Sequence, residues 1–140
     1  MAGALLLAAV AGLSTGCREV TETAPAGYEP AAVETVAGRE VKRVTFTDEA
    51  VKRVGLRTAP VRSSGTRLVV PYAALIYDGK GTPWVYTAST PLSYLRTKVV
   101  VDRIDGNRAF LAKGPPAGSQ VVTIGATEVY GAELEISGGH

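Results

Sequence analysis

YLRTKVVVDRIDGNRAFLA, at residues 94–112, carries the clearest structural signal in the chain. Over residues 94–104 apolar and polar side chains alternate, which predicts a strand with one buried and one solvated face. The expected inner face carries Leu95, Thr97, Val99 and Val101, and the expected outer face carries Tyr94, Arg96, Lys98 and Asp102. The Asp105-Gly106 pair is a strong turn signal, so residues 107–112 are expected to return as the second strand of a hairpin.

Short apolar runs separated by turn residues continue this pattern on both sides of the hairpin. We predict further strands at residues 44–46, 56–62, 67–70, 84–88, 121–124 and 132–136, and a single turn at 72–75. In the last of these strands Leu134 is expected to point inward, and Glu133 and Glu135 are expected to point outward.

One short helix is predicted at about residues 48–54. Thr47 can cap its N-terminus, and Gly55 has the freedom that the residue after a helix often needs. The helix and the strands together predict a mainly β fold, a small β-barrel or β-roll of about six to eight short strands.

Composition limits the chemistry that the chain can perform. It has 140 residues, enough for one domain, and a net charge of +2, too small to argue for a nucleic-acid partner. A single Cys excludes an internal disulfide, and the one histidine, His140, offers no basis for a Ser-His-Asp or Cys-His catalytic pair. Zinc and soft-metal sites need several Cys, His or Met ligands, so we expect no metal and no cofactor.

The first residues have the pattern of an export signal. Residues 1–16 carry no charge and include an apolar run at 4–13, which is too short to span a bilayer. Leu13-Ser14-Thr15-Gly16-Cys17 looks like a lipobox, so Cys17 is the predicted site of lipid attachment to the outer face of the cytoplasmic membrane. Two alternatives are secretion without a lipid, after cleavage by general signal peptidase, and a buried helix with an incidental thiol.

A change of composition near residue 40 predicts where the folded part begins. Residues 18–39 are rich in Ala, Glu, Thr and Pro and have few large apolar groups, which favours an extended spacer. The predicted organisation is a signal peptide at 1–16, a lipid-anchored tether at 17–40 and a β domain at 41–137. In the alternative interpretation, residues 33–41 add an edge strand to the domain.

Several segments resemble one known family in both order and spacing. The quoted segments are VTFTDEAVKRVGLRTAPV at 44–61, VPYAAL at 70–75, WVY at 84–86, RTKVVV at 96–101 and GPPAGSQVVTIG at 114–125. They resemble the membrane-proximal domain of periplasmic adaptors, the membrane fusion proteins of resistance-nodulation-division efflux pumps. The resemblance covers about residues 41–136 and implies the fold of that domain.

The chain also departs from that family. In a full adaptor a barrel, a lipoyl domain and a helical hairpin separate the first two segments, whereas Val61 and Val70 are only nine residues apart here. Pro115 stands where the family usually has Leu. The resemblance therefore implies a stand-alone module without the parts that reach an outer-membrane channel.

Catalysis is not expected. Asp105 is explained as a turn residue, and Asp102 and Lys98 are placed on the solvated face of a strand, so no cleft with paired acids or a buried amine is predicted. We therefore predict that the chain is not an enzyme.

The aromatic residues are candidates for recognition of a protein partner, because Tyr and Trp are enriched at interface hot spots, although in a small barrel they more often pack in the core or at the rim. The candidate contact residues are Trp84, Tyr86, Tyr94, Arg96, Pro115 and Pro116, with loops 77–83 and 114–118 presented by the body. Packing in the core or at the rim is the alternative role for these aromatic side chains, including Tyr130. Arg96, Lys98, Arg103 and Arg108 are candidates for a basic patch, or for an ordinary solvated face.

The leading hypothesis is a non-catalytic, extracytoplasmic lipoprotein that docks, like an adaptor, on a membrane transporter, permease subunit or other envelope complex. The anchor at Cys17 would raise the local concentration and make a weak contact sufficient. The alternative is a carrier that holds a small apolar ligand or lipid in the barrel interior, which a connected cavity above ~300 Å³ would favour.

Overall fold

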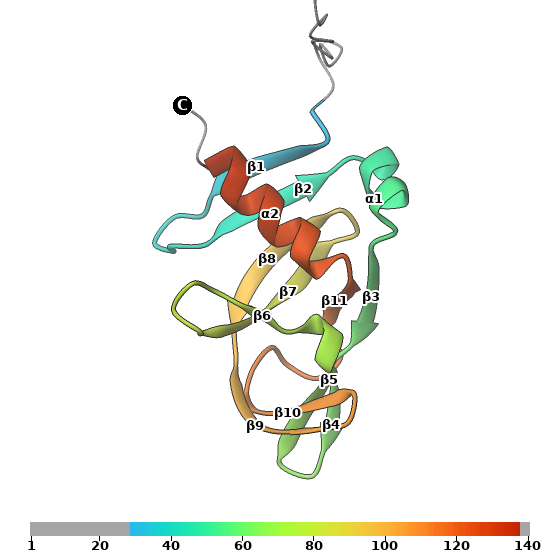
Figure 1. Cartoon of the computed structure of the whole chain (residues 1–140), viewed down its shortest axis with the longest axis vertical. Coiled ribbons are helices and arrows are strands. Elements are labelled where there is room, and N and C mark those ends of the chain that lie inside the picture. The colour runs from blue at the N-terminus through green and yellow to red at the C-terminus, as the bar shows by residue number, and fades with distance from the viewer. Residues whose placement is uncertain (1–28, 138–140) are drawn as a thin grey trace, which may run out of the picture.

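The computed structural model describes residues 29–137, so the predicted signal peptide, Cys17 and His140 lie outside the described residues. The described part contains eleven strands, two helices and one short 3-10 helix (Figure 1). The elements are β1 (Ala31–Thr35), β2 (Lys42–Phe46), α1 (Asp48–Val54), β3 (Arg57–Pro60), β4 (Arg62–Ser64), β5 (Arg67–Pro71), η1 (Tyr72–Ala74), β6 (Ile76–Tyr77), β7 (Pro83–Thr90), β8 (Ser93–Lys98), β9 (Val100–Asp105), β10 (Arg108–Lys113), β11 (Gln120–Ile124) and α2 (Ala126–Ser137).

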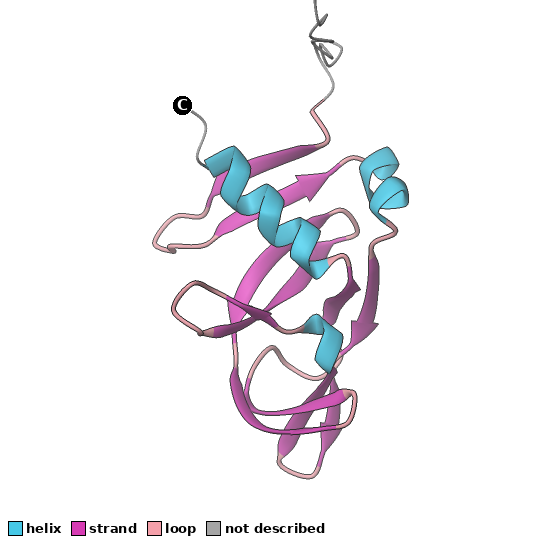
Figure 2. Cartoon of the chain, in the orientation of Figure 1, coloured by secondary structure: helices cyan, strands magenta, loops and turns pink. Residues whose placement is uncertain are grey.

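The strands form two antiparallel sheets. Sheet A has the order β1-β2-β8-β7-β11-β3, with β6 paired to β7, and sheet B has the order β4-β5-β10-β9. Figure 2 shows the large sheet and its helices toward one end of the long axis, and sheet B at the other end. The predicted mainly β fold class is confirmed, with more strands than expected.

Two single residues carry the chain from one sheet to the other. Val61 joins β3 of sheet A to β4 of sheet B, and Val99 joins β8 to β9. Both side chains are buried, and both backbones are hydrogen-bonded: Val61 N–H donates to Ser119 O at 2.8 Å, and Val99 N–H donates to Pro83 O at 3.1 Å. The predicted strand at 94–104 is therefore two strands that belong to different sheets.

Apolar side chains fill the space between the two sheets. Val85 and Val121 of sheet A meet Val70 and Leu111 of sheet B, and none of these side chains has measurable exposure. A second core lies between sheet A and α2, centred on Val44, Tyr86, Tyr94, Val122 and Val129.

Helix α1 forms as predicted. The Thr47 hydroxyl accepts a hydrogen bond from Ala50 N–H at 3.1 Å, and Gly55 is left-handed with φ of 73°. Both ends of this short helix are therefore closed by the residues that the sequence indicated.

The predicted strand at 132–136 is wrong, because these residues belong to α2. Ala126, Val129, Tyr130 and Glu133 follow one another at helical spacing and face sheet A. The expected orientation is reversed: Glu133 is 3% exposed, whereas Leu134 is 50% exposed. Alternation over only three residues resembled a strand, and the longer helical period decided the structure.

The segment predicted as a tether contains an edge strand. Strand β1 pairs with β2, Ala31 lies opposite Phe46, and its side chain is buried. The alternative interpretation of an added strand is the one observed, although the strand spans Ala31–Thr35 instead of 33–41.

The hairpin after β9 is confirmed with a shifted turn. Asp105 pairs with Arg108, so the two loop residues are Gly106 and Asn107, and Gly106 has φ of 59°. Among the two central residues only Gly106 has a positive φ, which is the pattern of a type II′ hairpin turn and which glycine adopts without strain.

Candidate interaction site

Several predicted contact residues come together, but beneath α2. Tyr86 and Tyr94 are 0% and 2% exposed, so the prediction that they contact a partner is wrong for this structure. Trp84 is half-buried. In the separate 114–118 loop, Pro115 is buried and Pro116 is exposed. The expectation that Tyr94 and Arg96 lie on a solvated strand face is also wrong, because α2 covers that face of sheet A.

Glu133 is the centre of the polar contacts under α2. Its carboxylate accepts from Arg96 Nη2 at 3.1 Å, from the Tyr86 hydroxyl at 2.5 Å and from Lys42 N–H at 3.2 Å. These three donors lie on β8, β7 and β2, so one carboxylate joins the helix to three strands. Burial, together with the hydrogen bond to Glu133, raises the pKa of Tyr86 far above its usual value.

Aromatic rings enclose the Arg96 guanidinium. Its central carbon lies 4.6 Å from the Trp84 ring centroid and 5.3 Å from that of Tyr130. Trp84 Nε1–H in turn donates to Asp78 at 3.0 Å. Hydrogen bonds from Thr82 N–H, and then from Trp84, hold the pKa of Asp78 below its usual value. These contacts hold α2 and the 78–82 loop on sheet A, which is a structural role.

Sheet B presents a different group of charges to solvent. Its inner face packs Val70, Ala109 and Leu111 against sheet A. Its outer face carries one arginine from each of its four strands: Arg62 (β4), Arg67 (β5), Arg108 (β10) and Arg103 (β9). We call this outer surface the arginine face.

Strand register brings these residues onto one face. Arg62 lies opposite Val69, and Val69 lies opposite Phe110. Phe110 lies opposite Arg103, and directly opposed residues project from the same side of a sheet. The guanidinium carbon of Arg103 is 3.8 Å from the Phe110 ring centroid, and that of Arg108 is 5.4 Å away. Arginine stacking therefore explains why Phe110 is only 4% exposed on an outer face.

Two aspartates partly balance the arginines. Asp102 forms an ion pair with Arg67, whose Nε lies 3.1 Å from the carboxylate, and lies 3.7 Å from Arg103 Nη1, at a position where the β9–β10 register shifts. Asp105 lies 3.4 Å from Arg108. Among residues 29–137, Arg62 has no carboxylate within ion-pair distance. Four arginines against two aspartates leave this face with an excess of positive charge.

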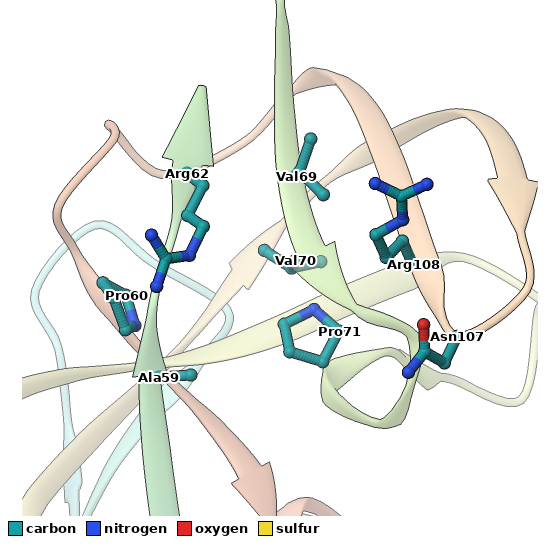
Figure 3. A pocket seen from close by; sticks show the side chains of 8 residues that line it. All are labelled: Ala59, Pro60, Arg62, Val69, Val70, Pro71, Asn107 and Arg108. Carbon is teal, nitrogen blue, oxygen red and sulfur yellow. The ribbon is translucent and has the colours of Figure 1, made fainter. Parts of the chain in front are cut away.

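A surface pocket opens where the arginine face meets β3. It has a volume of about 280 Å³, and its lining includes Pro60, Arg62, Val69, Pro71, Asn107 and Arg108. Figure 3 shows Arg62 and Arg108 on opposite sides of the chain segment that forms its apolar floor. None of the lining residues is acidic.

The sequence identified this site only in part. Arg103 and Arg108 were candidates for a basic patch with Arg96 and Lys98, or for an ordinary solvated face, but Arg96 lies under α2, and the two arginines lie with Arg62 and Arg67. The available signal was the pair of arginines, Arg62 and Arg67, on either side of the Gly65-Thr66 turn, which places them on neighbouring strands.

No protein-family model matches the chain, and neither curated proteins nor solved structures provide a match. In the part of the chain that the structure describes, neither helix has both the length and the apolar character needed to span a bilayer. Over the same residues, Asp, Glu, His and Cys side chains do not gather in groups of three or more that could hold a metal ion.

Proposed function

We propose that the chain is a non-catalytic, extracytoplasmic binding module, anchored through a lipid on Cys17, that docks on an acidic surface of a membrane transporter or related envelope complex. The arginine face is the docking surface. The single observation that carries this proposal is the presence of four arginines, one from each strand, on the solvent side of a sheet whose other side is packed.

The physical properties of the face support this role. Arginine is enriched at interface hot spots, and an excess of positive charge speeds association with an acidic partner. Arg103 is already stacked on Phe110, so less side-chain freedom is lost when a partner binds.

The position of the face supports docking away from the membrane. The chain enters the body at β1, and Figure 1 places sheet B at the opposite end of the long axis. A lipid anchor upstream of β1 would leave the arginine face directed toward a membrane complex that projects from the lipid surface. The resemblance of the sequence motifs to those of efflux adaptors supports the same class of partner.

The filled interior favours docking over the carrier alternative. Val70, Val85, Leu111 and Val121 have no measurable exposure between the sheets. The described pocket of about 280 Å³ lies on the surface, and its walls include charged side chains. A lipid carrier would instead need an apolar cavity inside the body.

The test is co-purification of full-length, acylated protein from its native membrane. The variant Arg67→Gln/Arg103→Gln leaves the face with two arginines and two aspartates, and the matched control Lys52→Gln/Lys80→Gln removes the same charge elsewhere from exposed positions. Transporter or permease subunits are expected with wild type and the control, and at least tenfold less with the face variant.

Three outcomes would contradict the proposal: no envelope subunit with wild type, equal recovery with all three proteins, or equal loss with the control. Urea denaturation of each protein checks folding, because exposed ion pairs contribute only ~0–1 kcal/mol. A Cys17→Ser variant that stays in the membrane fraction would remove the lipid anchor from the proposal.

A further inference from the structure

The pocket beside β3 has the two components of a ligand site. Its floor is apolar, formed by Ala59, Pro60, Val69 and Pro71. Its walls carry hydrogen-bond donors that project from separate strands and from the hairpin turn. Clefts that combine an apolar lining with a few convergent polar groups are the usual form of small-molecule sites.

The charges in the pocket select for an anion. Arg62 stands on one side, without an ion pair among the described residues, and Arg108 stands on the other (Figure 3). Asp105 forms an ion pair with Arg108 at 3.4 Å and balances its charge, so the net charge around the pocket is close to that of Arg62 alone. That balance suits a monoanion better than a dianion.

We propose that this pocket binds a small carboxylate with a short branched aliphatic body. The carboxylate accepts hydrogen bonds from the Arg62 guanidinium, and Arg108, on the other side of the pocket floor, adds positive charge to the site. The aliphatic body covers Val69 and Pro71. The planar fork of a guanidinium matches the two oxygens of a carboxylate, which is why arginine is common in such sites.

The size of the pocket sets the size of the ligand. Its volume of about 280 Å³ lies just below the range for drug-sized ligand pockets, which starts at ~300 Å³, so the ligand must be small. A ligand of about eight non-hydrogen atoms fits this space, and at ordinary ligand efficiency it binds with a Kd of about 1 mM.

The experiment is a titration of the full chain with 4-methylpentanoate, followed by backbone NMR shifts. Shifts are expected at Val69, Asn107 and Arg108, with saturation near millimolar concentration. Arg62→Gln is expected to weaken binding about tenfold, as loss of a charged hydrogen bond implies. Lys52→Gln, which removes an equal charge on α1, is expected to leave the Kd unchanged.

Two further ligands separate the contributions. The neutral analogue 4-methylpentanamide is expected to bind at least fivefold more weakly, and inorganic phosphate is expected not to displace the carboxylate at equal concentration. The proposal is overturned if no shifts saturate, if the amide binds equally, or if phosphate competes as well as the carboxylate. Docking is tested with Arg67 and Arg103, which do not line the pocket, so either proposal can fail without the other.

Discussion

Replacing Glu133 with alanine is the most informative test of how α2 is held. The change removes the acceptor of Arg96, Tyr86 and the Lys42 N–H together. The Arg96 side chain is only 12% exposed, so its charge would be left largely buried without a carboxylate. Removing one partner of a buried ion pair costs ~3–5 kcal/mol.

The expected loss lies toward the lower end of that range. Arg96 retains its contacts with Trp84 and Tyr130, and its partial exposure allows water to reach it. We therefore expect a loss of about 3 kcal/mol in the free energy of unfolding, of which the Tyr86 hydroxyl contributes ~1–2 kcal/mol. With a urea m-value of ~1.5 kcal/mol/M, the midpoint falls by about 2 M.

The assay is equilibrium urea denaturation of the full chain, followed by Trp84 fluorescence and far-ultraviolet circular dichroism. Glu135→Ala is the matched control, because it removes an exposed carboxylate from the same helix and is expected to change stability by less than ~0.5 kcal/mol. A double-mutant cycle of Glu133→Gln with Tyr86→Phe is expected to show coupling of about 1 kcal/mol or more.

The reasoning is refuted if Glu133→Ala and Glu135→Ala destabilise equally and by less than ~1 kcal/mol. That result would be expected of a surface strand in which both carboxylates face water. A large loss in both variants would also refute it, because it would assign the effect to the helix in general and not to the buried carboxylate.

Three other perturbations test separate parts of the structure. Gly125→Ala is expected to lower the free energy of unfolding by about 2–3 kcal/mol in urea denaturation, because Gly125 has φ of +86° and a Cβ there would overlap the Leu56 side chain. The control Gly118→Ala, with φ of +91° but open space around the new Cβ, is expected to lower it by only about 1 kcal/mol. Thr47→Ala removes the cap of α1 and is expected to cost about 1 kcal/mol, seen as a lower Tm; an unchanged Tm would argue against the cap. The folded-state pKa of Tyr86 is raised, so its contribution to stability is full below about pH 10 and is lost as pH rises further. The stability advantage of wild type over Tyr86→Phe is therefore expected to shrink between about pH 9 and 12. A constant difference would contradict this.

Features set by near neighbours in sequence could be predicted. The cap at Thr47, the left-handed Gly55 and the turn at Gly106 each depend on a few adjacent residues, and each was placed within one position. The mainly β fold class followed from the same kind of local pattern.

Features set by distant contacts could not be predicted in the same way. Glu133 is buried because its carboxylate accepts hydrogen bonds from Arg96 and Tyr86, which lie 37 and 47 residues away in the sequence. The residues adjacent to Glu133 in the sequence gave no sign of those partners. The arginine face depends on the pairing of four strands from two separate hairpins. Arg62 and Arg103 lie on the same face of sheet B only because of that strand register.

The single-residue crossings at Val61 and Val99 have a mechanical consequence. They are two of the four connections between the sheets, and each is clamped by a backbone hydrogen bond and a buried side chain. Bending one sheet against the other would require both clamps to open together. The body therefore acts as a rigid strut, and whatever binds to sheet B is held at a fixed distance and orientation from the strand through which the chain arrives.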